Sequence, residues 1–130
     1  MRFMSPVLIM VLLAATADPA SSQEVDKAEC LRKNPGITSP VEMATCTFDL
    51  AGSERALESA LAERAGRLSA GQRDVLARRQ QAWLAARDRR CVREAGSWRN
   101  TGHGSAVIAC TADANRARPA ELQRPLKASR

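Results

Sequence analysis

Apolar residues recur along one stretch of the chain at steps of three, four or seven positions, the spacing of one face of an amphipathic α-helix. Gly52 and Ser53 fall inside this stretch and predict a kink or a split, because glycine disfavours a helix interior by about 1 kcal/mol relative to alanine. The apolar stripe consists of Met43, Cys46, Leu50, Leu57, Leu61, Ala65 and Leu68.

Two capping signatures predict where helices begin. Ser39, Pro40 and Glu42 supply an N-cap serine, a proline at the first helical position and the glutamate of a capping box. Ser69 and Gln72 form a second capping box, so we expect the chain to turn there and run back antiparallel. The next helix, about 72–94, carries on or near one face Leu76, Gln80, Trp83, Arg87 and Cys91.

Shorter elements are expected at the N-terminal side of this pair. Residues 25–33 predict a short helix, which the sequence Asn34-Pro35-Gly36 ends. Residues 18–24 are mostly small and polar, and they predict a flexible lead-in.

A last helix is expected after residues 96–104, which are rich in glycine and polar side chains. Ser105 is the candidate N-cap of this helix. Pro119 and Pro125 predict an irregular basic C-terminal tail, which we assign to residues 123–130. The apolar residues of the last helix are Val107, Ile108 and Cys110.

Residues 1–17 have the pattern of a signal peptide, with a basic residue, an apolar run and small residues before a cleavage site. The apolar run is too short to cross a bilayer comfortably, which disfavours the alternative of an uncleaved anchor. We therefore expect cleavage near Ala17, no membrane anchor, and a periplasmic or secreted product.

Composition narrows the classes of function. The chain has 130 residues, about one domain, and its 20 Lys and Arg against 14 Asp and Glu give a net charge of +6. Aromatic residues make up only 3% and tyrosine is absent, which argues against single-stranded nucleic acid, because such binding relies on base stacking. No nucleic-acid partner is expected.

Four cysteines, an even number in a chain expected to be exported, predict two disulfides. The chain has no C-x-x-C motif and His103 is its only histidine, so we expect no metal site and no cofactor. Three pairings are open, and the two local bonds are favoured because each closes a modest loop between consecutive segments. These bonds join Cys30 with Cys46 and Cys91 with Cys110.

These features together predict one all-α domain over residues 25–122. The chain shows no internal repeat and no alternation long enough for a strand. We expect a small disulfide-stapled bundle of three longer helices preceded by a short N-terminal helix.

The segments 80–91 and 102–110, taken with the positions of the four cysteines, resemble the lysozyme inhibitor LprI family. The resemblance spans nearly all of the chain that remains after export. It implies a protein without chemistry of its own that binds lysozyme and blocks it sterically, protecting peptidoglycan. The matching residues are Cys30, Cys46, Gln80, Trp83, Arg87, Asp88, Cys91, Gly104, Ser105, Cys110, Arg118 and Leu122.

Three positions depart from the family pattern or strain it. Ala86 stands where an aromatic residue is usual, and Asn115 stands where threonine is usual. Pro119 would clash with the carbonyl four residues back in a continuous helix, so the end of the last helix is left open.

Two roles are open for Gln80, Trp83 and Arg87, which share one helical stripe. Trp83 can bury its ring while Arg87 stacks on it or binds a carboxylate. One interpretation is a structural network that fixes helix register, and the other is direct contact with a partner.

The segment 96–105 is the candidate for partner recognition, because loops on a rigid scaffold carry much of the recognition in proteins. A disulfide between Cys91 and Cys110 would clamp its base. The alternative is a solvated loop whose Gly-Ser pair only caps a helix. The candidate contact residues are Trp98, Arg99, Asn100, His103 and Ser105.

An enzyme is not expected. A nucleophilic mechanism needs a base beside a reactive Ser or Cys, whereas the cysteines are expected to be oxidised and only one histidine is present. Many acidic residues lie among arginines on helix faces, where solvated ion pairs are the default. Two functions are left open. One is a lysozyme inhibitor, and the other is a non-inhibitory binding module for anionic envelope polymers or an envelope protein. The binding module agrees better with the positive net charge.

Overall fold

The computed structural model describes residues 19–126, with side chains from Asp26 onward, and contains no strand in that range. The all-α prediction is confirmed, while the expected signal peptide lies outside the described residues. None of the helices in residues 19–126 is long and apolar enough to cross a membrane. The elements are α1 (Pro19–Lys33), α2 (Pro40–Thr47), α3 (Leu50–Gly66), α4 (Ala70–Glu94) and α5 (His103–Leu122).

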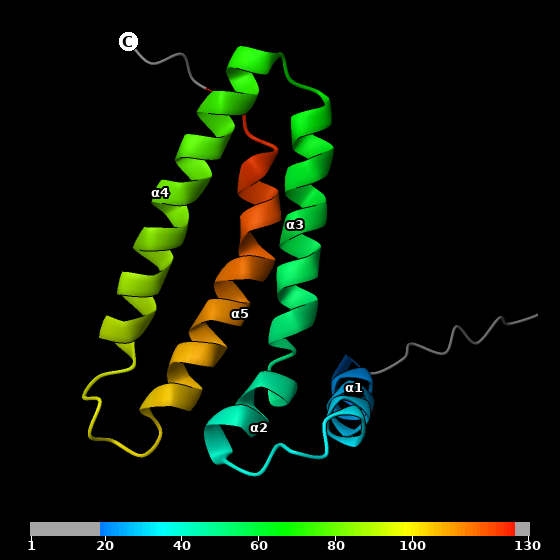
Figure 1. Cartoon of the computed structure of the whole chain (residues 1–130), viewed down its shortest axis with the longest axis vertical. Helices are drawn as coiled ribbons and strands as arrows, with labels where there is room; N and C mark the ends of the chain where they lie inside the picture. The colour runs from blue at the N-terminus through cyan, green and yellow to red at the C-terminus, as the bar shows by residue number, and fades with distance from the viewer. Residues whose placement is uncertain (1–18, 127–130) are drawn as a thin grey trace, which may run out of the picture.

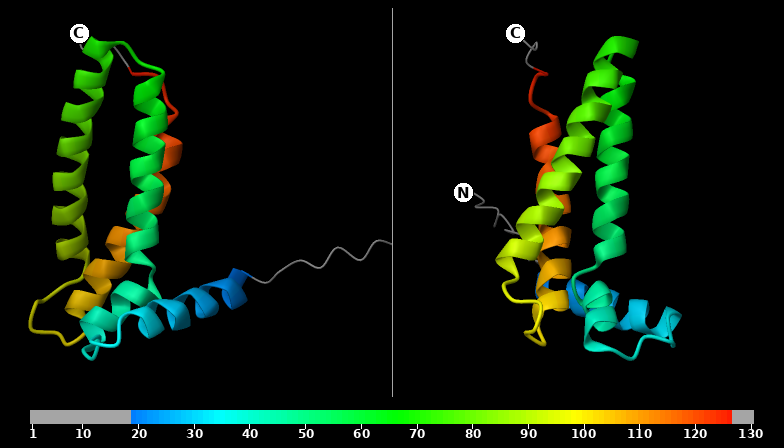
Figure 2. Two further views of the ribbon diagram at one scale, coloured as in Figure 1. Left: turned by 45° about the vertical axis from the view of Figure 1, so that its right-hand side comes forward. Right: turned by 60° about the vertical axis from the view of Figure 1, so that its left-hand side comes forward.

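Three long helices form the body of the molecule (Figure 1). Helices α3 and α4 run antiparallel, as the second capping box predicted, and α5 packs against both. Helix α2 contacts α5, and α1 lies against α2 and projects away from the long helices (Figure 2). We call the end where α3 passes into α4 the turn end. The opposite end, formed by α2 and the α4–α5 loop (residues 95–102), is the loop end.

Both predicted capping boxes are present. The Ser39 hydroxyl accepts the Glu42 N–H at 3.2 Å, and the Glu42 carboxylate accepts the Ser39 N–H at 3.1 Å. At the start of α4, Ser69 and Gln72 exchange the same two bonds at 3.3 and 3.0 Å. Each box satisfies backbone N–H groups that the first turn of a helix leaves without partners.

The apolar stripe is split into two helices, α2 and α3. The break lies at Phe48 and Asp49, whereas Gly52 and Ser53, where the interruption was expected, lie in the first turn of α3. Asp49 has a left-handed backbone with φ of 46°, and its carboxylate accepts the Gly52 N–H at 3.1 Å. A Cβ on Gly52 would lie only 2.0 Å from that carboxylate, so this N-cap requires glycine. Met43, at the start of the stripe, is exposed.

Two expectations about helix ends are wrong, and the structure decides a third point that the sequence leaves open. Helix α1 begins at Pro19, within the expected lead-in, because proline is already set for the first helical position. Helix α5 begins at His103 with Gly102 as N-cap, so Ser105 is not the cap. Helix α5 also continues through Pro119 to Leu122, whose side chain is buried in the core and holds the last turn in place.

The apolar core lies among the three long helices towards the turn end. Its buried members are Leu57, Leu76 and Leu122, one from each helix. Each fully buried aliphatic side chain contributes about 1.5 to 3 kcal/mol, so this core alone is a modest source of stability. The half-buried residues packed against it are Ala60, Leu61, Ala65, Leu68 and Trp83.

Two disulfides stabilise the rest of the molecule, and their pairing is as expected. One joins Cys30 of α1 to Cys46 of α2, and the other joins Cys91 of α4 to Cys110 of α5. The Cα atoms are 5.5 Å apart in each, an ordinary separation for a disulfide. Covalent bonds therefore support the part of the fold where the buried apolar residues are small, such as Ala44 and Ala112.

Candidate functional site

The family-pattern residues of α4 meet α5 around the ring of Trp83. The Arg87 and Arg118 guanidinium carbons lie 5.5 and 5.0 Å from the ring centroid, within the range of cation–π attraction. Arg118 donates from Nε to Gln80 at 3.2 Å and from Nη1 to Glu121 at 2.8 Å. Helices α4 and α5 are thus joined through one aromatic ring and two arginines.

A buried polar chain continues from this ring into α3. Arg87 donates to the Asn115 side-chain oxygen at 2.7 Å, and the Asn115 amide donates to the Ser53 hydroxyl at 3.1 Å. Ser53 in turn donates to the Leu50 carbonyl at 2.7 Å. Asn115 is fully buried and Ser53 nearly so. Because a buried polar group without a partner is costly, this chain fixes how the three helices align.

The geometry favours the structural interpretation of this motif over partner contact. Gln80 is buried, and the side chains of Arg87 and Arg118 are each only 14% exposed. Asp88 is exposed and pairs with Arg87 at 2.7 Å, while Leu122 belongs to the core.

The sequence alone does not reveal two members of the buried polar chain. In the sequence, Asn115 stands out only as a departure from the family pattern, and Ser53 only as part of a helix interruption. The sequence signal for both is a polar residue at a helix position where the apolar pattern predicts a buried side chain.

Gly104 and Ser105 lie apart from this network, where α5 docks on α2. A Cβ on Gly104 would lie 2.8 Å from a methyl carbon of Val41, closer than side chains normally approach. The Ser105 hydroxyl donates to the Pro40 carbonyl at 3.5 Å. Gly104 therefore permits the close contact between α5 and α2, and Ser105 adds a hydrogen bond to it.

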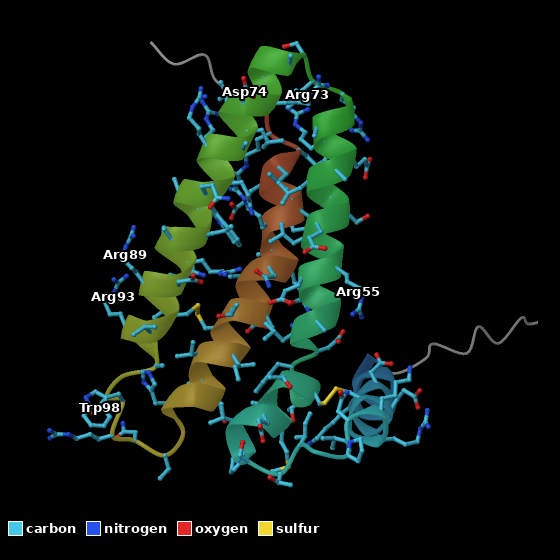
Figure 3. The ribbon with its side chains drawn as sticks, viewed as in Figure 1. Arg55, Arg73, Asp74, Arg89, Arg93 and Trp98 are labelled. Atoms are coloured by element: carbon cyan, nitrogen blue, oxygen red, sulfur yellow. A yellow bond between two sulfur atoms is a disulfide. The ribbon has the colours of Figure 1, made fainter. Side chains whose placement is uncertain are left out.

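The α4–α5 loop presents Trp98 at its tip. Trp98 is 76% exposed, more than the exposed Val41, Met43 and Val92, and Figure 3 shows it projecting from the loop end. The Arg99 guanidinium carbon lies 5.3 Å from the Trp98 ring centroid. Asn100 is exposed beside them, whereas His103 and Ser105 are half-buried.

Internal hydrogen bonds give this loop a defined shape. Arg99 N–H donates to the Ser97 hydroxyl at 3.3 Å, and Asn100 N–H donates to the Ser97 carbonyl at 3.0 Å. Gly96 has φ of 76°, a conformation that favours glycine and redirects the chain after α4. The disulfide between Cys91 and Cys110 ties the two helices that carry the loop, so its tip is held at a fixed position.

Further exposed apolar side chains gather at the loop end. Val41 and Met43 belong to α2, and Val92 lies in the last turn of α4. A groove of about 520 Å³ runs beside the disulfide, lined by Arg90 and Glu94 of α4 and Asp113 of α5 among others.

Positive charge is concentrated on α4. This helix carries seven arginines against three acidic residues, a net charge of +4. Arg78, Arg89 and Arg93 are exposed and make no ion pair within residues 19–126. Figure 3 shows Arg89 and Arg93 pointing outward on the same side as Trp98.

No metal centre can be built from the described side chains, among which no group of three or more His, Cys, Asp and Glu gathers. His103 lies at the first position of α5, and its Nδ1 atom is buried without a hydrogen-bond partner in residues 19–126. None of the hydrogen bonds described above joins the His103 side chain to a nucleophile or an acid.

The sequence profile described as lysozyme inhibitor LprI matches residues 20–122 of the chain. The chain belongs to the lysozyme inhibitor LprI family. No curated protein and no solved structure matches it.

The region shared with the LprI family runs from the first turn of α1 to the last residue of α5. It contains both disulfides, the buried polar chain and the α4–α5 loop. Membership in the LprI family agrees with the resemblance carried by the Trp83 motif and the four cysteines. The buried residues of that motif join α3, α4 and α5, while Trp98 at the tip of the α4–α5 loop is exposed.

Proposed function

We propose that this LprI-family chain is an exported protein that binds lysozyme and blocks it sterically, thereby protecting peptidoglycan. The family description supports the target class. The signal-peptide pattern and the two disulfides support export into an oxidising compartment.

The observation that carries this proposal is the fixed, exposed tip of the α4–α5 loop. Trp98 stands clear of the bundle on a loop whose helices are joined by the disulfide between Cys91 and Cys110. A preformed loop loses little conformational freedom on binding, so its contacts contribute more fully to affinity. Tryptophan and arginine are also the residues most often found at the energetic centre of protein interfaces.

The test is lysis of a peptidoglycan suspension by an animal-type lysozyme, titrated with the mature oxidised protein. We expect dose-dependent inhibition that is lost when both disulfides are reduced, because the loop end then loses its clamp. A folded, oxidised sample that leaves lysis unchanged would refute this target class.

A second candidate function rests on the charge of α4. Arg78, Arg89 and Arg93 form an outward cationic stripe, which favours a non-inhibitory module that binds anionic envelope polymers. The expected result is retention on anionic cell-wall material that high salt releases and that replacing these three arginines with alanine abolishes. Retention that survives high salt would contradict an electrostatic mechanism.

A further inference from the structure

The tip of the α4–α5 loop combines an aromatic face with an unopposed positive charge. Residues 95–102 contain Trp98 and Arg99 and no acidic residue. The Arg99 guanidinium stacks over the Trp98 ring and makes no ion pair in the described part of the chain. The other face of the ring and the hydrogen-bond donors of the guanidinium are therefore available to a partner.

The reaction centre of a lysozyme has matching chemistry. It contains two carboxyl groups on either side of the scissile bond, in a cleft shaped to bind a glycan. One carboxyl is kept protonated by an apolar pocket and the other stays ionised in a polar environment. A guanidinium binds a carboxylate through two parallel hydrogen bonds, which a lysine cannot reproduce.

We infer that Trp98 and Arg99 enter the glycan cleft of lysozyme together. Arg99 binds the ionised catalytic carboxylate, and the Trp98 ring occupies space that a sugar ring of the substrate would fill. This inference rests on the proposed function and adds the contact residues and the mode of inhibition. It makes inhibition competitive with glycan.

The charge distribution is compatible with this mode of binding. Animal-type lysozymes are basic. Cleavage near Ala17 removes only Arg2 among the charged residues, so the exported chain keeps a net charge of +5, which opposes long-range approach. The catalytic carboxylate is a local negative group within such a protein, and a single projecting arginine can reach it. Close complementarity of this kind acts mainly on the rate of dissociation.

The experiment compares Trp98→Ala, Arg99→Ala and Arg99→Lys with the wild type and with Arg55→Ala as a control. Arg55 is exposed on α3 and lies on the opposite side of the molecule from Trp98 in Figure 3. Its replacement with alanine removes the same positive charge as Arg99→Ala. Lysis assays give the inhibition constant. Calorimetry gives the dissociation constant for lysozyme alone and for lysozyme whose cleft is filled by a chito-oligosaccharide.

We expect Trp98→Ala and Arg99→Ala each to weaken binding by at least about tenfold, as for central interface residues. Arg99→Lys should recover only part of the loss, and Arg55→Ala should bind like the wild type. The oligosaccharide should compete with the wild-type protein. Thermal unfolding of the loop variants should be unchanged, because both side chains are exposed.

Two results would overturn the inference while leaving the proposed function standing. One is wild-type inhibition that both alanine variants retain, and the other is equal binding to lysozyme with an empty and with a filled cleft. Failure of the wild-type protein to bind lysozyme would instead remove the proposed function and this inference together.

Discussion

The two tryptophans of this chain each lie against arginine, yet their surroundings differ. Trp83 is half-buried between α4 and α5, packs against the core and contacts two arginines that are themselves hydrogen-bonded. Trp98 stands in solvent with one arginine. The same pair of residue types thus supports the scaffold in one place and presents an accessible surface in the other.

Replacing each tryptophan with alanine separates these roles. Trp83→Ala should lower the free energy of unfolding by about 3 kcal/mol, because it removes a large side chain from the core and leaves Arg87 and Arg118 without the ring. Trp98→Ala should change it by less than about 0.5 kcal/mol, since an exposed side chain loses little on truncation. Denaturant titration measures both. An unchanged midpoint for Trp83→Ala would place this residue outside the scaffold.

At the scale of elements, close packing and capping decide how α2 sits at the loop end. Helix α2 is only eight residues long, and it is held by a capping box, a disulfide to α1 and the contact with α5. Short helices are marginal by themselves, so tertiary contacts supply most of their stability. Two changes test the contact and the cap separately.

Gly104→Ala tests the contact between α5 and α2. The added methyl would lie 2.8 Å from Val41, so we expect a loss of about 1 to 3 kcal/mol, as for other overpacked sites. Gly71→Ala is the matched control, because Gly71 is the second residue of α4, as Gly104 is of α5, and a Cβ there meets nothing within 4 Å. Adding Val41→Ala to Gly104→Ala should restore part of the loss. Equal midpoints for the two alanine variants would refute the close-contact explanation.

The cap of α2 predicts a pH dependence. Hydrogen bonds from the Ser39 backbone N–H and hydroxyl lower the pKa of the Glu42 carboxyl below its usual 4.5. A group whose pKa is lower in the folded state contributes stability above the unfolded pKa and loses it as the pH falls through the folded pKa. Glu42 therefore contributes fully above pH 4.5 and loses this contribution progressively as the pH falls below 4.5 and through its lower folded-state pKa.

Glu42→Gln keeps a capping side chain but cannot titrate in this range. We expect stability close to the wild type in strong acid, and a smaller fall in melting temperature between pH 6 and pH 3. Glu58→Gln on α3 is the charge-matched control. The lowered pKa of Glu29, caused by hydrogen bonds from Arg32 and Lys33, remains in both variants. Identical acid profiles for Glu42→Gln and Glu58→Gln would contradict this role.

At the scale of the whole molecule, stabilising features are divided between two ends. The leucine core lies towards the turn end, and the disulfides hold the parts that carry α2 and the α4–α5 loop. The positive charge follows α4 along one side of the bundle. These distributions give separate predictions for inhibition and for the rate of association.

Removing the two disulfides one at a time should have unequal effects on inhibition. In the chain-entropy treatment each loop closure contributes roughly 3 kcal/mol. Replacing both cysteines of either disulfide with alanine should therefore lower the free energy of unfolding to a similar extent. The variant without Cys91 and Cys110 should lose inhibition, because that bond clamps the recognition loop. The variant without Cys30 and Cys46 should retain it at temperatures where it is folded. The reverse order would place the contact surface on the α1–α2 side.

Salt dependence tests the influence of net charge. Because the chain and a basic lysozyme repel each other at long range, adding salt should leave the association rate unchanged or increase it. Replacing Arg78 and Arg89 with alanine should raise that rate at low salt and leave dissociation unchanged. Stopped-flow association over a range of ionic strength measures this. A steep fall of the rate with salt would contradict the account.

The sequence by itself determined the features that depend on neighbouring residues. Both capping boxes, the turn at Ser69 and the helical class follow from local backbone hydrogen bonding and from apolar spacing. The sequence also predicts the local disulfide pairing, because short loops are the easiest to close. The loop was singled out by composition, although its role in recognition is still a prediction.

Only the tertiary structure decided the features that join distant segments. The chain from Arg87 through Asn115 to Ser53 joins residues that are 28 and 62 positions apart. The Gly104 contact with Val41 and the passage of α5 through Pro119 likewise depend on what packs beside them. Local propensity specifies where helices start, whereas their alignment and the burial of each polar group are set by packing between elements, which no spacing along the chain encodes.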